Sequence, residues 1–167
     1  MGQYYKVINK TKKEWLCPHT FGNGLKLMEF VSDGKGVLQG LAILLAEGNG
    51  RGGGDLQSDN KLIGSWSGDE ISIVGDYADS GLYDTATQNY RNISKETFKC
   101  LMEDHWLNAE AKKHIKEYGD KYLMSAELEV LEEVFPEELA EARKMAKATE
   151  VFRRKMEKVK NELKSNA

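Results

Sequence analysis

Near the start of the chain, two short segments with apolar side chains flank a polar one, a pattern typical of a β-hairpin. Residues 3–8 and 13–16 are rich in aromatic and β-branched residues, and the polar residues 9–12 separate them. Residues of this kind favour a pleated surface, so the two segments predict an antiparallel hairpin. We expect its aromatic side chains to lie mainly in a core. They are Tyr4, Tyr5 and Trp15.

Further along, the side-chain pattern has a period of two in residues 62–66 and 71–75, on either side of Gly68 and Asp69. A two-residue turn that begins with glycine is common in hairpins, so this pattern predicts a second hairpin, in which Trp66 faces the second strand. Both faces of this hairpin are partly apolar. We therefore expect it to lie in a sheet that is covered on each side.

Two segments between the predicted hairpins have the apolar spacing of helices. Residues 25–31 predict a short helix with Leu25, Met28 and Phe30 directed inward, and residues 32–36 interrupt it. Residues 37–46 are apolar on nearly every side, which predicts a centrally buried helix.

A third helix of the N-terminal part is predicted over residues 95–105, with Ser94 as its N-cap. The segment before it, residues 82–92, is polar and predicts no regular element. Fourteen of the sixteen glycines lie between Gly22 and Gly81, and the part from residue 109 onward holds only one and is helical in composition. We therefore place a core domain at residues 1–108 and a helical extension at residues 109–167.

The extension holds one glycine and equal numbers of acidic and basic residues, thirteen of each. Its spacing predicts helices at 110–118 and 124–134 and a long helix from Pro136, a residue that suits the first helical turn. Apolar residues recur along the long helix at steps of three and four, the spacing of a coiled-coil seam. These seam residues are Ala142, Met145, Thr149, Phe152, Met156, Val159 and Leu163.

Three partners for this seam remain open. The preceding helix could fold back on it as an αα-hairpin, with Leu128, Leu131 and Val134 against the seam. A second copy of the chain or a foreign protein would suit the same pattern.

Five of the seven residues from Gly48 to Gly54 are glycine. Glycine loses the most backbone entropy on ordering, so an ordered run of this kind needs a cause. One cause is local, because Gly48 follows a helix, where glycine commonly takes the left-handed conformation. Beyond that, the run predicts either a mobile surface loop or a backbone whose N–H groups receive an anion, with Arg51 as a charged arm. It is not a P-loop, because the Lys-Ser or Lys-Thr pair is missing, and it is not a dinucleotide fingerprint, because it follows a helix.

We expect a binding surface formed by this loop, by the acidic end of the second hairpin and by the basic end of the long helix. Its residues are Asn49, Arg51, Gly52, Gly53, Gly54, Asp55, Tyr77, Arg153 and Arg154.

Composition narrows the class of protein. The chain has 167 residues, of which 40% are hydrophobic and 31% charged, as in a globular domain. A formal net charge of −3 argues against a surface that coats nucleic acid. No apolar run approaches the roughly 18 residues of a membrane span, and the start has no secretory signal. The two distant cysteines, Cys17 and Cys100, suit a reducing compartment. We expect a cytoplasmic protein, in the host cytoplasm if a phage encodes it.

Acidic side chains near the glycine loop and the second hairpin offer an alternative chemistry. Oxygen ligands from several aspartates suit Mg²⁺, and a nearby histidine could activate water. The alternative function is therefore a metal-dependent phosphodiester hydrolase or nuclease. Its candidate residues are His19, Asp55, Asp69, Asp76 and Asp79. Aspartates are also common in turns, so the leading interpretation has no catalysis and no cofactor.

Zinc is a further alternative, because Cys17 and His19 together with Cys100 and His105 would provide four ligands if the two segments met. Neither spacing is typical of a zinc finger or ribbon, and two buried thiols explain the cysteines equally well.

The opening MGQYYKVINKTKKEWLCPHTFGNGLKLMEF, followed by GNGRGGGDL and GSWSGDEISIVGDYAD, resembles an uncharacterised family of small bacterial and phage-borne proteins. The resemblance covers about residues 1–83 and assigns no catalytic residue. It implies a phage or mobile-element context, in which small acidic proteins often inhibit host machinery by binding. It therefore implies an anti-CRISPR-like inhibitor of a host defence or nucleoprotein machine that acts by stoichiometric binding.

These patterns together predict an α+β fold, with antiparallel β-hairpins packed with short helices and followed by a helical C-terminal extension that ends in a long amphipathic helix. The expected partner is a host protein or nucleoprotein complex, and not a membrane. Self-association through the C-terminal helix stays open.

Overall fold

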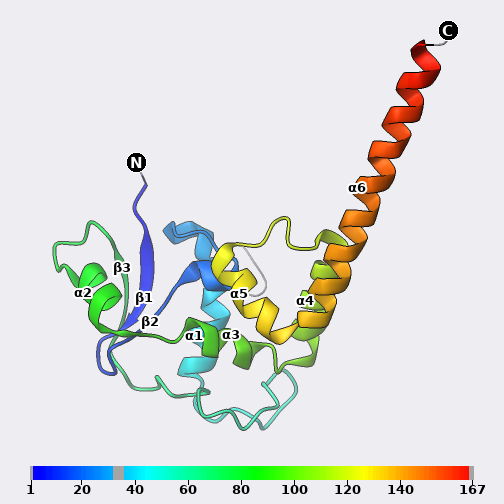
Figure 1. Ribbon diagram of the computed structural model, residues 1–167. Coiled ribbons are helices and arrows are strands. Elements are labelled where there is room, and N and C mark those ends of the chain that lie inside the picture. Colours follow the sequence, from blue (N-terminus) through cyan, green and yellow to red (C-terminus); the bar gives the residue numbers. More distant parts are fainter. Residues whose placement is uncertain (1, 32–35, 166–167) are drawn as a thin grey trace.

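Figure 1 shows the computed structural model of the chain, which describes residues 2–31 and 36–165, with side chains up to residue 157 of the last helix. Four strands form one sheet in the order β3-β1-β2-β4. They are β1 (Tyr5–Asn9), β2 (Glu14–Leu16), β3 (Ile71–Gly75) and β4 (Arg91–Asn92). β1 pairs antiparallel with β2 and β3, whereas β2 pairs parallel with β4. Helices pack on this mixed sheet, so the predicted α+β class is confirmed.

The first predicted hairpin is confirmed as β1 and β2, with Ile8 opposite Trp15. The buried Asn9 fixes the turn between the strands. Its side-chain oxygen accepts a hydrogen bond from the backbone N–H of Lys12 at 2.9 Å, and its side-chain nitrogen donates one to Asp69 at 2.8 Å. A short amide side chain commonly stabilises a turn in this way.

The second predicted hairpin is wrong. Residues 61–68 form consecutive turns, and the backbone N–H of Trp66 donates to the carbonyl of Leu44 at 2.8 Å. Positive φ angles at Gly64 (71°) and Gly68 (78°) interrupt any extended strand here. β3 pairs with β1 instead, so Trp66 does not face β3 across a hairpin.

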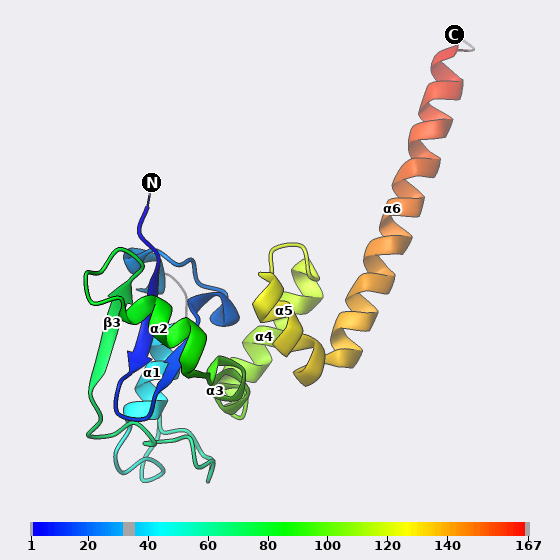
Figure 2. The same ribbon diagram turned by 60° about the vertical axis from the view of Figure 1, so that its left-hand side comes forward.

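Both faces of the sheet are covered, as the apolar pattern predicts. On one face, Val7 and Leu16 belong to the main hydrophobic core, which includes buried side chains of α1 (Val37–Leu45) and α3 (Ser94–Leu101). On the other face, a smaller cluster around Ile8, Trp15 and Val74 packs against α2 (Leu82–Asn89). Figure 2 shows α2 in front of the strands and α1 behind them.

The segment between the sheet and α3 differs from its prediction. Residues 82–92, expected to have no regular structure, contain α2 and β4. Ser94 is the first residue of α3 and not its N-cap. Its hydroxyl group accepts a hydrogen bond from the backbone N–H of Cys17 (2.7 Å) and donates one to Asn92 (2.5 Å). The serine therefore joins β2, β4 and α3 instead of closing the helix end.

Two short 3₁₀ helices, η1 (Pro18–Phe21) and η2 (Leu27–Val31), precede α1. In η2, Phe30 is buried as predicted, but Met28 is 76% exposed, because one short 3₁₀ turn cannot direct all its apolar residues inward. The predicted break covers residues 32–36, and residues 32–35 of it lie outside the described residues. The helix predicted over residues 37–46 is confirmed as α1, but its predicted central burial is wrong. Only Val37, Gly40 and Leu44 of this helix are buried, and Leu45 is 39% exposed.

The helix predicted over residues 95–105 is shorter, since α3 ends at Leu101 and α4 (His105–Tyr118) follows it. Asp104 caps α4 by accepting a hydrogen bond from the backbone N–H of Leu107 at 2.9 Å. The predicted boundary after residue 108 falls in the first turn of α4. Buried residues on both sides of it, including Ile115 and Leu131, belong to one hydrophobic core. The division into two domains stays a prediction.

The last two helices, α5 (Ser125–Val134) and α6 (Pro136–Ser165), confirm the predicted ones. Figures 1 and 2 show that α6 starts beside α4 and then extends far beyond the rest of the chain. Leu139 and Ala142 are buried, whereas Met145 and Met156 are 58% and 54% exposed. The alternative in which α5 covers the whole seam is wrong for this stretch. α5 does contact α6, but it packs mainly on η1, and Met145, Phe152 and Met156 stay exposed. The seam positions Val159 and Leu163 lie beyond the described side chains.

Within the described residues, no helix has both the length and the apolar character needed to cross a membrane.

Candidate functional site

The glycine loop, residues 48–55, joins α1 to the turns that precede β3. Three of its glycines have positive φ angles, Gly48 (78°), Gly50 (92°) and Gly54 (98°), which residues with a side chain rarely adopt. A Cβ atom added to any glycine of the loop would have no heavy atom within 4 Å. The backbone of the loop is therefore open to a partner and is not covered by the protein's own helices.

Asp55 closes this loop on itself. Its Oδ2 atom accepts hydrogen bonds from the backbone N–H groups of Gly50 (3.0 Å), Arg51 (2.7 Å) and Gly52 (3.0 Å). Successive N–H groups that converge on one point form a nest, which favours a negative charge. The hydrogen bonds from Arg51 and Gly52 lower the pKa of the Asp55 carboxyl below its ordinary value. The anion that this backbone receives is the loop's own carboxylate.

This arrangement corrects the expectation that the loop amides receive an external anion. Three of the amides are already engaged by Asp55, so an outside anion would have to displace a carboxylate that is covalently held in place. The side chain of Arg51 stays available. It is exposed, and in the described part of the chain no ion pair engages it.

Asn49 joins the two ends of the loop. Its side-chain nitrogen donates to the carbonyl of Leu56 at 2.7 Å, and its side-chain oxygen accepts from the N–H of the same residue at 3.0 Å. Leu56 is 8% exposed and anchors the loop in the protein. Beyond it, Glu103 accepts hydrogen bonds from the side chains of Ser58 and Asn60. The loop is held at its centre, at its base and at its exit, which supports the rigid interpretation over the mobile one.

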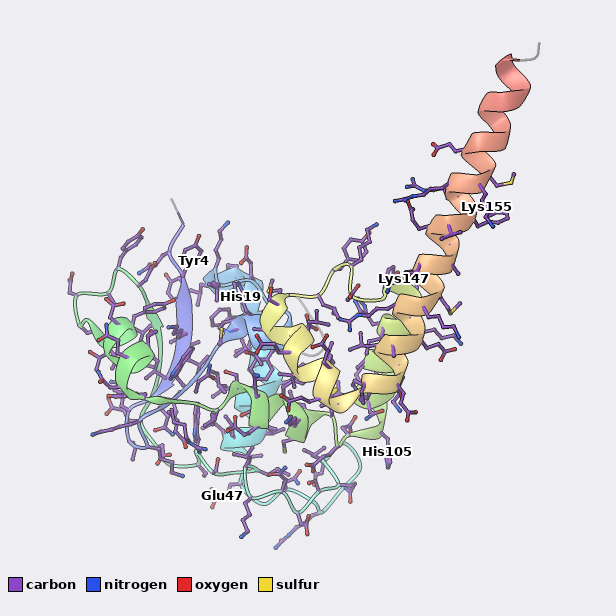
Figure 3. The ribbon with its side chains drawn as sticks, viewed as in Figure 1. Tyr4, His19, Glu47, His105, Lys147 and Lys155 are labelled. Carbon is purple, nitrogen blue, oxygen red and sulfur yellow. The ribbon has the colours of Figure 1, made fainter. Side chains whose placement is uncertain are left out.

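The other predicted binding residues lie elsewhere. Tyr77, 64% exposed, follows β3, and next to it Asp76 accepts a hydrogen bond from the backbone N–H of Tyr4 at 3.0 Å. Figure 3 labels Tyr4 on the upper side of the molecule and Glu47, directly before the glycine loop, at its lower edge. Tyr77 and the glycine loop therefore occupy opposite ends and do not form one surface.

Arg153 and Arg154 are remote from both of these regions, on the projecting part of α6. Both form ion pairs with Glu150, at 2.9 Å and 2.8 Å. Pairs of this kind on an exposed helix stabilise it slightly, so the two arginines have a structural partner already.

The predicted metal sites are not formed. Among the described side chains, those of residues 2–30 and 36–157, no three His, Cys, Asp or Glu come together in a group that could hold a metal ion. The magnesium set fails because Asp76 lies beside Tyr4, whereas Asp55 belongs to the loop that follows Glu47 on the opposite side of the molecule (Figure 3). His19 lies in η1. Asp79 is exposed in the turn after β3.

The zinc set fails for a similar reason. Cys100 is fully buried in α3, where burial raises the pKa of its thiol to about 11, whereas His105 is exposed at the start of α4. Cys17 is a free thiol after β2, and no disulfide joins the two cysteines.

One buried charge, that of Lys6, is not among the sequence predictions. Lys6 is 6% exposed, and its Nζ atom lies 4.2 Å from the ring centre of Trp15 and 4.0 Å from that of Tyr83. It also donates a hydrogen bond to the hydroxyl group of Thr87. Burial lowers the pKa of the Lys6 ammonium group. These contacts of Lys6 hold α2 against the sheet. The one indication of its burial in the sequence is its position two residues before Ile8 in a mostly apolar strand.

Compared with protein-family models, with curated proteins and with solved structures, the chain gives no significant match. The resemblance to small bacterial and phage-borne proteins therefore stays an expectation.

Proposed function

We propose that this chain is a binding protein that presents the glycine loop to a macromolecular partner and acts stoichiometrically. The narrower proposal is that the partner is a host defence or nucleoprotein machine, which the protein inhibits in an anti-CRISPR-like manner. This narrower part rests on the resemblance to small bacterial and phage-borne proteins.

The observation that carries the proposal is an ordered loop that packs against nothing. Asp55 and Asn49 hold the backbone in one conformation, yet all five glycines face open space. Ordering a glycine-rich segment costs more entropy than ordering any other, and no buried apolar contact of the glycines offsets that cost. Local structure maintained without a packing role is a reason to infer function.

A loop of this kind suits recognition by shape. Without side chains at residues 52–54, a partner can approach the backbone closely, and a preformed conformation reduces the entropy lost on binding. Arg51 adds one exposed guanidinium group, which forms paired hydrogen bonds with a carboxylate or a phosphate. These properties favour a partner with a narrow groove and an acidic or phosphate group beside it.

The test uses Gly53→Trp, because a side chain at this position meets nothing in the protein itself and requires no positive φ. The matched control is Asp79→Trp, which places the same indole in the exposed turn at the other end of the sheet. Both variants should keep the wild-type circular dichroism spectrum and thermal midpoint.

Each protein is titrated into purified CRISPR effector complexes during target-DNA cleavage, and each is expressed in bacteria that carry the same systems during phage challenge. We expect wild type and Asp79→Trp to inhibit at about one molecule per complex and Gly53→Trp to lose inhibition. Equal inhibition by Gly53→Trp contradicts the role of the loop. Inhibition at far below one molecule per complex contradicts stoichiometric binding. If none of the systems is inhibited, the narrower proposal is wrong.

A further inference from the structure

The outer part of α6 has no cover within the protein. Leu139 and Ala142 are 1% and 8% exposed against the rest of the chain, but exposure rises to 58% at Met145 and 65% at Phe152. Figure 2 shows the helix leaving the other elements at this point and continuing alone. In proteins most of the stability of a helix comes from the packing of its apolar face, so a partner along this part would stabilise it.

The exposed apolar side chains lie on one face of this helix. Met145, Thr149, Phe152 and Met156 follow one another at steps of four, three and four, which places them in a single stripe. The three large residues of the stripe are all more than half exposed. A contiguous exposed apolar stripe marks an interaction surface.

We propose that this stripe pairs with the same stripe of a second copy of the chain, in antiparallel orientation. This proposal is independent of the glycine loop and of the function proposed for it. It commits to a two-helix contact whose midpoint lies between Glu150 and Val151.

Side-chain size supports this arrangement. Around that midpoint, Met145 lies opposite Met156 of the second copy, and the small Thr149 lies opposite the large Phe152. In the two central pairs a large residue then meets a small one, as in well-packed helix pairs, and a flexible Met–Met pair lies at each end. In a parallel pair in register, the two Phe152 side chains would face each other and the two Thr149 side chains would leave a gap.

Charge favours the same orientation. Arg153, Arg154 and Lys155 lie to one side of the midpoint, and Lys144 and Lys147 lie to the other. In the antiparallel pair, Arg154 lies level with Lys147 of the second copy, but Glu157 lies level with Lys144 of that copy. A parallel pair in register would place every charge level with its own equivalent, so that only like charges meet.

The groove beside Met145 offers space for the second helix. Two hollows of ≈ 300 Å³ and ≈ 660 Å³ lie between α4 and α6, and Met145, Ala142 and Lys116 line both of them. Met156 of the second copy would lie over this groove. Lys116 has no ion pair within the described residues, so the groove also accepts an acidic side chain such as Glu157 of the second copy.

The contact is small. Three large side chains per helix, at 150–250 Å² for a fully buried aromatic residue, bury about 1,000 Å² in total when the flanking side chains are included. This lies at the lower limit for a specific interface, so we expect a dissociation constant of about 1–100 μM.

The experiment measures the mass of the full chain by sedimentation equilibrium from about 1 μM to several hundred μM, the range set by this affinity. We expect a monomer–dimer equilibrium for wild type. Phe152→Glu should weaken the dimer at least about 30-fold, as expected for a residue at the centre of an interface. The matched control is Val151→Glu, which adds the same charge to a neighbouring residue of similar exposure, 53%, that lies off the stripe. A wild-type monomer at all concentrations, or an equal effect of the two substitutions, overturns the proposal.

Orientation is tested by oxidation of single-cysteine substitutions, with the native Cys17 and Cys100 as the wild-type background. We expect that neither Met145→Cys nor Met156→Cys forms disulfide-linked dimers alone, and that a mixture of the two does. Dimers formed by each variant alone would overturn the antiparallel arrangement.

Discussion

Replacing Asn49 with alanine tests whether the glycine loop is a fixed structure. The side chain of Asn49 forms two hydrogen bonds with the backbone of Leu56, at 2.7 Å and 3.0 Å. A hydrogen bond between neutral groups contributes about 0.5–1.5 kcal/mol net, so the loss of both should destabilise the closed loop by about 1–3 kcal/mol. Opening of one surface loop does not require unfolding of the whole protein, so this change acts on the local opening equilibrium.

The assay is amide hydrogen exchange of Leu56 and of residues 50–52, measured by NMR or mass spectrometry. Since 1.4 kcal/mol is a factor of ten in an equilibrium constant, about 1–3 kcal/mol predicts about 5- to 150-fold faster exchange. Gln57→Ala is the control, because Gln57 is exposed, lies next to the anchor and forms no part of these contacts. If exchange in Asn49→Ala equals that in wild type, the loop is not held by this side chain, and the argument from preorganisation fails.

Three further outcomes follow from other contacts. Trp66 is fully buried and donates a hydrogen bond to Glu14 at 2.7 Å, so Trp66→Ala should lower the free energy of unfolding in urea by about 3–5 kcal/mol and Trp66→Phe by clearly less; equal losses would refute this. Folding lowers the pKa of the Asp55 carboxyl, so Asp55 stabilises the closed loop at pH values above its unfolded pKa and stops doing so as the pH falls through its folded pKa. The protection of residues 50–52 from hydrogen exchange should therefore decrease below about pH 4, and Asp55→Asn should show no such decrease. Burial raises the pKa of the Cys100 thiol to about 11, so its contribution to stability should be fully present below about pH 8.5 and decrease as the pH rises to about 11. In thermal melts, Cys100→Ala should remove this decrease of the thermal midpoint with pH, and Cys17→Ser should not.

Local patterns predicted the elements whose partners are near in sequence. β1 and β2 are joined by a short turn, so their aromatic and β-branched residues and the polar segment between them identified both strands and their pairing. The pairing of β3 was not predictable in this way, because its partner β1 lies more than 60 residues earlier and the competing segment around Trp66 also alternates. α2 was missed because only Ala86 of that helix is fully buried, which leaves almost no apolar period.

For the candidate site, the density of glycine was enough to identify the loop, but not its internal contacts. Asp55 follows the glycines directly, and only the positive φ angles of Gly50 and Gly54 turn three amides toward its carboxylate. The metal hypothesis failed because spacing in the sequence does not show that the glycine loop and the end of β3 lie far apart. Lys6 was missed since its aromatic neighbours come from β2 and α2, and α2 was not predicted.

The order of the strands has a consequence for synthesis on the ribosome. The sheet has the first hairpin at its centre, and β3 and β4 add to its two outer edges. The central pair can therefore close as soon as the first 16 residues have emerged, and each later strand finds a preformed edge. A nascent chain that grows outward from its earliest segment never has to insert a late strand between two earlier ones, which reduces the opportunity for misfolding during translation.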